Sequence, residues 1–184
     1  MLRTKDVIQR TARSTMAGVF AVGLVCGSTL AVTMLAGSPG GASVARVPAC
    51  TTGGLVEWLN TQGNGAAGTI YYNLQFTNLS GHACTFRGYP GVSGVNLGGV
   101  QLGRAAARSS TTPVKTITIG QGKTAMATLG ITDVGALSPS QCHPTTAAGL
   151  RIYAPNQTTS KLIPFPFNAC AKAGASYLTV QAVR

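Results

Sequence analysis

The chain has 184 residues, and 14 Lys and Arg oppose three Asp and Glu, which gives a formal net charge of +11. Three acids and two histidines leave few groups for acid–base catalysis or metal binding. The sequence contains no run of five or more basic residues, so a nucleic-acid-binding arm is not indicated. We therefore expect no enzyme, no cofactor, no metal site and no nucleic-acid partner.

The first 45 residues have the composition of an export leader. Residues 1–13 hold four basic residues and one acid, residues 16–35 carry no charge, and small residues follow up to Ala45. A basic start, an apolar centre and a small-residue exit are typical of a signal peptide. We expect cleavage after Ala45, with Ala42 as the alternative, and a linker-like tether over residues 36–48.

Two other interpretations of the leader remain open. Residues 16–35 are long enough to span a bilayer as an uncleaved N-terminal anchor, which would then be the only membrane contact. Lipidation at Cys26 is the third interpretation, although the β-branched Val25 fits the processing site poorly. All three place residues 46–184 outside the cytoplasm, in the cell envelope or secreted.

Residues 46–184 have the size of a single domain, with ten basic residues and only Glu57 and Asp133 as acids, a formal charge of +8. A surface of this charge attracts anions. The expected partners are anionic envelope components, namely lipid head groups or cell-wall polymers, or an envelope protein. The alternative is that the scattered bases only form the solvent-exposed faces of the strands and bind no partner.

Period-two alternation, which is typical of β-strands with one buried face, begins at residues 55–59. A turn is predicted over residues 61–65. The clearest strand covers residues 70–77, where Ile70, Tyr72, Leu74 and Phe76 share one face and Tyr71 lies on the other. The turn at residues 78–81 is rich in residues that bond their own backbone, so Asn78 is interpreted as turn chemistry rather than a glycan site.

Further strands are predicted in the remainder of the chain, with turns between them. Residues 134–149 interrupt this alternation of strands and turns, and residues 145–150 are predicted to hold one helical turn. Eight or nine short strands favour an antiparallel sandwich or barrel. The predicted ranges after residue 78 are 92–97, 100–102, 115–119, 125–131, 150–154, 161–165 and 177–183.

Four cysteines behind an export leader indicate two disulfides formed in an oxidising compartment. Cys50 precedes the first predicted strand and Cys84 follows the second, so the two lie at the same end of a hairpin. Cys142 and Cys170 flank the predicted hairpin of residues 150–165 in the same way. We expect the pairs Cys50–Cys84 and Cys142–Cys170.

The residues from Phe76 to Gly81, the block from Cys84 to Val92, and the segment Cys142-His143-Pro144 resemble an actinobacterial exported family, the domain of unknown function 4232. The resemblance also includes residues 119–125, Cys170 and the closing strand at residues 178–180, and it covers about residues 50–183. It implies a disulfide-stapled, all-β, two-sheet β-sandwich with a Greek-key-like, immunoglobulin-like topology. It implies no activity and no catalytic residues.

Outward aromatic residues are the first candidates for a binding surface, because they could line a carbohydrate platform. Tyr71 is the strongest of them, and the others are Trp58, Tyr89, Tyr153 and Tyr177. The segment from Arg87 to Gly91 lies beside a disulfide and would present Arg87 and Tyr89 on a rigid loop. Each feature has a structural alternative, a core aromatic or a tight turn. We take Tyr71, Arg87 and Tyr89 as the possible binding surface.

A hydrolase directed at the cell wall is the alternative function, with His82 or His143 as its centre. Glu57 and Asp133 lie in different predicted segments, and the sequence contains no G-x-S-x-G motif. We therefore expect an exported, non-catalytic binding protein. A structural surface protein without a soluble ligand is the third possibility.

Overall fold

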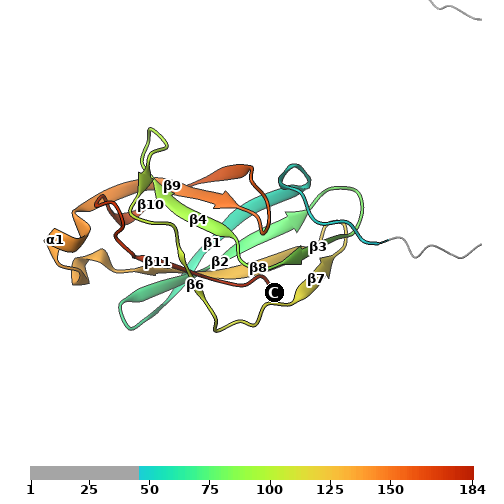
Figure 1. The fold of residues 1–184 in the computed structure, drawn as a ribbon, viewed down its shortest axis with the longest axis horizontal. Helices are drawn as coiled ribbons and strands as arrows, with labels where there is room; N and C mark the ends of the chain where they lie inside the picture. The colour runs from blue at the N-terminus through green and yellow to red at the C-terminus, as the bar shows by residue number, and fades with distance from the viewer. Residues whose placement is uncertain (1–45) are drawn as a thin grey trace, which may run out of the picture. The chain divides into compact units, whose positions relative to one another are not determined.

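The computed structural model describes residues 46–184, so the interpretations of the leader, the anchor and Cys26 lie outside the described residues. Eleven strands make up most of this part (Figure 1). None of its helices is long and apolar enough to cross a membrane. The elements are η1 (Thr52–Gly54), β1 (Leu55–Ala66), β2 (Thr69–Asn78), β3 (Cys84–Arg87), β4 (Gly91–Val95), β5 (Gln101–Leu102), β6 (Ala107–Ser109), β7 (Thr116–Ile119), β8 (Thr124–Thr132), η2 (Val134–Ala136), α1 (Pro139–Cys142), β9 (Pro144–Tyr153), β10 (Ser160–Cys170) and β11 (Leu178–Gln181).

The strands form three sheets. The largest has the order β1-β2-β8-β11-β6, the second β10-β9-β4-β5, and the third pairs β3 with β7. All pairs of these strands are antiparallel except β6–β11, which is parallel. The expectation of a wholly antiparallel fold is therefore wrong at this edge, because about 70 residues and several other strands separate β6 from β11, so no hairpin joins the two.

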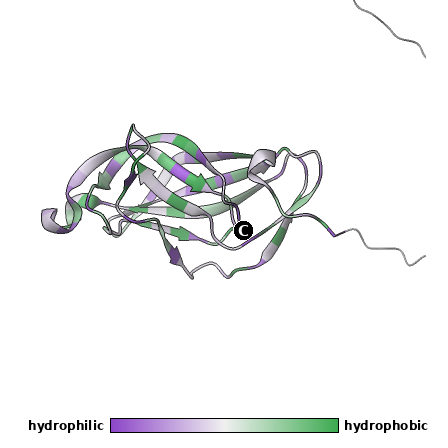
Figure 2. Cartoon of the chain, turned by 45° about the horizontal axis from the view of Figure 1, so that its top comes forward, coloured by the Kyte–Doolittle hydropathy of each residue, from purple (hydrophilic) through white to green (hydrophobic). Residues whose placement is uncertain are grey.

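Alternating burial confirms the predicted two-faced strand in the second half of β2, but Ile70, which was predicted on the buried face, is exposed. Leu74 and Phe76 are fully buried, whereas Tyr71 is exposed and Gln75 is half-buried. The same alternation of hydrophobic and hydrophilic residues recurs along other strands in Figure 2. Because successive side chains of a strand point to opposite faces, β2 presents one face to the core and a polar face to solvent.

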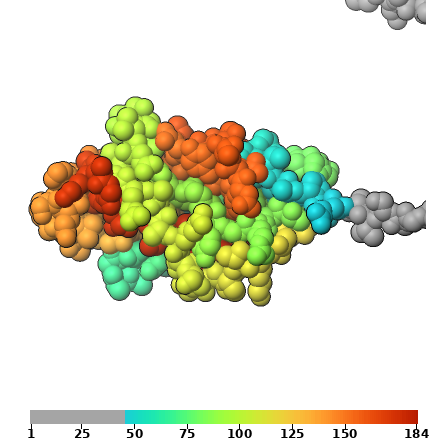
Figure 3. Space-filling view, in the orientation of Figure 1, coloured from blue at the N-terminus to red at the C-terminus, as the bar shows by residue number. Residues whose placement is uncertain are grey.

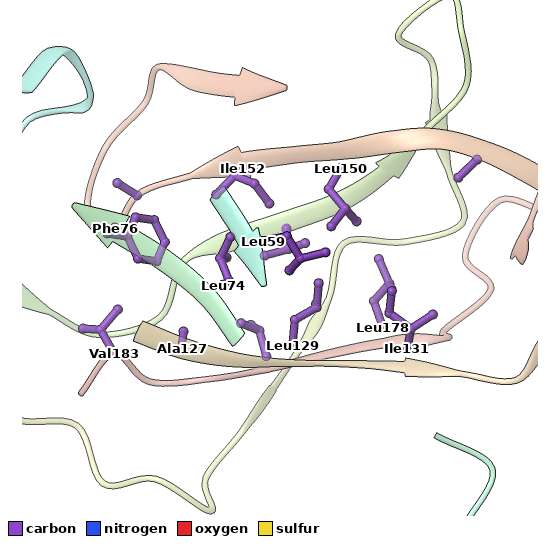
Figure 4. Packing of buried hydrophobic residues seen from close by; sticks show 14 of the residues in the cluster. Leu59, Leu74, Phe76, Ala127, Leu129, Ile131, Leu150, Ile152, Leu178 and Val183 are labelled. Atoms are coloured by element: carbon purple, nitrogen blue, oxygen red, sulfur yellow. The ribbon is translucent and has the colours of Figure 1, made fainter. Parts of the chain in front are cut away.

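Both larger sheets contribute to one hydrophobic core. Leu74 and Leu129 come from the five-stranded sheet, and Leu150 and Ile152 come from the four-stranded sheet (Figure 4). All four are fully buried. Each buried side chain of this size contributes about 1.5–3 kcal/mol, so this shared core is the main source of stability.

The turn predicted at residues 61–65 is wrong, because β1 continues through this segment to Ala66. The hairpin turns instead at Ala67 and Gly68, whose φ angles are 48° and 74°. Two consecutive residues of positive φ make the twist that a two-residue hairpin loop requires. The Gly and Asn residues of the predicted turn coincide with an irregularity in the register between Asn60 and Asn64.

The helical turn predicted at residues 145–150 is also wrong, since these residues belong to β9. The strand pairs with β10 on one side and β4 on the other. Gly149 explains the close pairing, because a Cβ there would lie 2.4 Å from the carbonyl oxygen of Ile163. The helical turn lies earlier, in α1, where Pro139 occupies the first position.

Two disulfides join Cys50 to Cys84 and Cys142 to Cys170, with Cα–Cα distances of 4.8 Å and 4.6 Å. This is the pairing expected from the hairpin ends. Leu55 lies opposite Asn78 in the β1–β2 pair, and Pro144 lies opposite Cys170 in the β9–β10 pair. The Cys142–Cys170 bridge therefore closes the open end of the β9–β10 hairpin. The Cys50–Cys84 bridge joins the segment before β1 to the first residue of β3, just beyond the end of the β1–β2 hairpin.

Candidate functional site

An open pocket of about 530 Å³ lies where β3, β6 and the β9–β10 loop meet. Arg87 ends β3, Tyr89 follows it, and Arg108 is on β6. Asn156 and Gln157 enter from the β9–β10 loop. Figure 3 shows the yellow-green segment that leads into β6 on the surface turned to the viewer. We call this site the arginine pocket, defined by Arg87, Tyr89, Arg108 and Asn156.

Backbone geometry fixes the pocket's walls. Gly88 has a φ of 105°, and its carbonyl oxygen accepts a 3.0 Å hydrogen bond from the N–H of Val183. Asn156, with a φ of 60°, donates from Nδ2 to the carbonyl oxygen of Arg87 at 3.0 Å. Because these bonds link segments distant in sequence, the loop from Arg87 to Pro90 is held to both the C-terminal segment and the β9–β10 loop.

The charged residues that line the arginine pocket are all basic. The Cζ atom of Arg108 lies 5.5 Å from the centroid of the Tyr89 ring, a cation–π distance. Arg87 and Arg108 are both exposed, and the residues that line the pocket include no acid. Two guanidinium groups can bind a carboxylate or phosphate through paired N–H donors. The amides of Asn156 and Gln157 can supply further donors.

Of the three residues predicted for the binding surface, the structure brings Arg87 and Tyr89 together and places Tyr71 elsewhere. Tyr71 lies on the outward face of β2, opposite Gly130 of β8. Trp58 is exposed on β1, but Tyr177 is buried in the core, where its hydroxyl donates to the carbonyl oxygen of Leu102 at 2.9 Å. Burial raises the pKa of Tyr177 to about 12.

Sequence reasoning missed Arg108 and Asn156 as members of the pocket. Arg108 lies on a three-residue strand paired with a strand about 70 positions later, and such a short segment shows no periodicity. Asn156 carried a recognisable signal, since Asn favours the positive φ of a tight turn. Nothing in the sequence indicated that this turn lies beside Arg87.

The hydrolase candidates do not form a cluster. His82 precedes β3 and His143 follows α1, and these elements lie at opposite ends of the domain in Figure 1. Asp133 accepts a hydrogen bond from the N–H of Gly135 at 2.9 Å. Across residues 46–184, no three His, Cys, Asp or Glu side chains are grouped as metal ligands.

Glu57 is the second acid of the described residues, and it is buried. It lies on the core face of β1 with 9% of its surface exposed, and neither carboxylate oxygen has a hydrogen-bond partner among the described residues. Burial raises the pKa of Glu57 from 4.5 to about 7, with an opposing effect from Lys161. The Lys161 ammonium donates to the carbonyl oxygen of Leu55.

Asn78 bears out its interpretation as turn chemistry. Its side chain is fully buried, and Nδ2 donates to the carbonyl oxygens of His82 at 2.8 Å and Ile119 at 3.1 Å. Its Oδ1 accepts from Ser80 through both the backbone N–H and the hydroxyl. A side chain engaged in this way ties β2 to the β3–β7 sheet.

The profile of one protein family, described as "Domain of unknown function (DUF4232)", matches residues 50–184. The chain belongs to the DUF4232 family. The DUF4232 match includes all eleven strands, both disulfides and every residue of the arginine pocket. Comparisons with curated proteins and with solved structures find no significant match.

Proposed function

We propose that this DUF4232 protein is an exported, non-catalytic binding protein whose arginine pocket binds an anionic group of a cell-wall polymer. The observation that carries the proposal is the presence of two exposed arginines, one of them with its guanidinium over an aromatic ring, in one pocket whose lining includes no acid. A phosphodiester or carboxylate of a polymer chain offers the planar or tetrahedral oxygens that guanidinium groups bind.

A polymer chain suits this site better than a lipid surface. The arginine pocket is concave, so a single chain can enter it, whereas a flat layer of head groups meets only its rim. Asn156 and Gln157 add neutral donors that a polymer's hydroxyl groups can use. The formal charge of +8 on residues 46–184 also raises the local concentration of a polyanion.

The disulfides and the core of the domain support a proposed location and a proposed fold type. Two disulfides suit an oxidising compartment, which supports export to the envelope or the medium. We assign the two larger sheets to a β-sandwich of Greek-key-like, immunoglobulin-like type. The core shared by the sheets supports this assignment, and the parallel strand β6 is then an addition at one edge.

Retention on an anionic cell-wall fraction tests the proposal. We expect the full-length chain to bind at low ionic strength and to be released toward ~0.5 M salt, where the Debye length is only a few ångströms. Arg87→Gln and Arg108→Gln should each weaken retention about tenfold, the effect of losing a charge-assisted hydrogen bond. Arg104→Gln changes the net charge equally outside the pocket and is the matched control.

Three results would contradict the proposal. Retention that survives high salt unchanged would show that charge does not drive binding. Equal losses in Arg108→Gln and Arg104→Gln would show that net charge, not the pocket, is responsible. Binding to anionic liposomes without binding to the wall polymer would make the partner a lipid surface.

A further inference from the structure

A second exposed surface is independent of the arginine pocket, on the outward face of the five-stranded sheet. Trp58 and Tyr71 are 42% and 37% exposed there, on β1 and β2. Trp58 lies opposite Gln75, four residues along β2 from Tyr71. The backbone positions of the two residues are therefore separated by about 13 Å along the strand direction. We call the outward side of β1, β2 and β8 the aromatic face.

Both aromatic rings are held in place on this face. The Nε1 of Trp58 donates to the hydroxyl of Thr77 at 3.3 Å. The ring of Tyr71 occupies space that Gly130 leaves open, since a Cβ at Gly130 would lie 3.1 Å from Cε1 of Tyr71. Rings that are fixed before binding lose little conformational entropy when a ligand covers them.

The strands that carry the two rings have no outward charge, although residues 46–184 have a formal charge of +8. The cation on this face is Arg184, whose guanidinium donates to the hydroxyl of Thr128 on β8 at 3.1 Å. Glu57 is the only charged residue in β1, β2, β8 and β11, and it faces the core. The polar residues around the rings are amides and hydroxyls, which both donate and accept hydrogen bonds. They are Asn60, Asn73, Gln75, Thr77, Thr124 and Thr128.

The ligand that matches this chemistry is a sugar chain without charged groups. Its C–H faces can pack on the exposed rings, and its hydroxyl groups can exchange hydrogen bonds with rows of amides and threonines. An anionic partner would find no cation on β1 or β2 beside the rings, because Arg184 lies across the sheet at Thr128 of β8. A second copy of the domain would bring two charges of +8 together, which disfavours self-association through this face.

We propose that the aromatic face binds a neutral polysaccharide through Trp58 and Tyr71. The site goes beyond the anion-binding function assigned to the arginine pocket. Each strand places its outward residues at a regular spacing, so the face suits an extended chain rather than a single sugar. One protein would then contact a neutral chain and an anionic group through different surfaces.

Depletion isotherms with insoluble neutral polysaccharides test this proposal on the full-length chain. The probes are cellulose, a β-1,3-glucan and a mannan. We expect binding to at least one of them that is unchanged between low salt and ~0.5 M salt, because no charges take part. Trp58→Ala and Tyr71→Ala should each weaken binding about tenfold, as expected for a buried aromatic anchor.

Two controls separate this site from other effects. Leu97→Ala removes an apolar side chain that is 97% exposed outside the face, and it should leave binding unchanged. Arg108→Gln should weaken binding to the anionic wall polymer but not to the neutral probe, so the two proposals fail independently. Thermal unfolding of each variant shows whether the fold is retained.

If the chain binds none of the three polymers, the proposal is wrong. An equal loss of binding in Leu97→Ala, or retention that disappears at high salt, would also overturn it. If the wild type is a dimer that Trp58→Ala converts to a monomer, without polysaccharide binding by either protein, the face is an interface between copies and the proposal is wrong.

Discussion

Of the two acids in residues 46–184, Glu57 is the one that the fold turns inward. It occupies a core position of β1 between Leu55 and Leu59, which are both buried. The desolvation of its carboxylate is not offset by a hydrogen bond from any described residue. Stability is therefore expected to depend on the protonation of this single side chain.

The free energy of unfolding should fall as the pH rises from about 4.5 to about 7. Below 4.5, the Glu57 carboxyl is protonated in both states, and between these values it ionises only in the unfolded chain. Above pH 7 the folded protein must hold the charge in this half-screened site, at a cost of about 1–3 kcal/mol. Urea unfolding at a series of pH values measures the change.

Glu57→Gln provides the comparison, because it keeps the shape of the side chain and removes its titration. We expect the fall in stability between pH 4.5 and 7 to disappear in this variant. A wild-type stability that stays level or rises over this range would show that the Glu57 carboxylate is stabilised in the folded protein.

At the scale of elements, the Cys142–Cys170 bridge closes the β9–β10 hairpin, whereas the Cys50–Cys84 bridge joins the segment before β1 to β3. The Cys50–Cys84 bridge lies beside the hydrogen bond from the N–H of Cys50 to the carbonyl oxygen of Thr85 at 2.9 Å. The Cys142–Cys170 bridge lies where α1 leads into β9. The bridged residues are 34 and 28 positions apart.

Replacing Cys142 and Cys170 together by Ser should lower the free energy of unfolding by about 3–4 kcal/mol, the chain-entropy value for a loop of this length. The Cys50→Ser and Cys84→Ser pair should have a similar effect, because its loop is only slightly longer. Denaturant unfolding of the two double variants measures both. A loss below about 1 kcal/mol would mean that the bridges do not constrain the unfolded chain.

Alternation made β2 and β8 predictable from the sequence, since one face of each is buried and the other is not. The extension of β1 was not predictable, because residues 61–66 are exposed and show no alternation. The strand at residues 145–150 was obscured by small residues, among which Gly149 allows the close approach of the β10 backbone.

The candidate site was only partly predictable, because its residues come from strands and loops that are distant in the sequence. Arg87 and Tyr89 are neighbours in sequence, so one loop indicated both. Arg108 and Asn156 join them through tertiary structure, by the parallel pairing of β6 with β11 and the hydrogen bond from Asn156 to Arg87. Long-range contacts of this kind leave no local pattern in a single sequence.

At the scale of the whole molecule, charge is distributed unevenly over the described residues. The arginine pocket gathers two of the ten basic residues, whereas on the aromatic face the strands β1 and β2, which hold the rings, have none, and Arg184 reaches only Thr128 of β8. Such a separation lets one surface attract an anionic group and the other contact a neutral chain without mutual interference. The sheets that carry the two surfaces contribute buried residues to the same hydrophobic core.

Hydrogen–deuterium exchange tests the anion-binding role of the arginine pocket most directly. Exchange of the full-length chain is measured with and without a poly(glycerol phosphate) chain. We predict slower exchange in residues 86–91, 106–109 and 154–157, and the loss of this protection in Arg108→Gln. No protection in these three segments, or protection confined to the aromatic face, would contradict the assignment of the anion site.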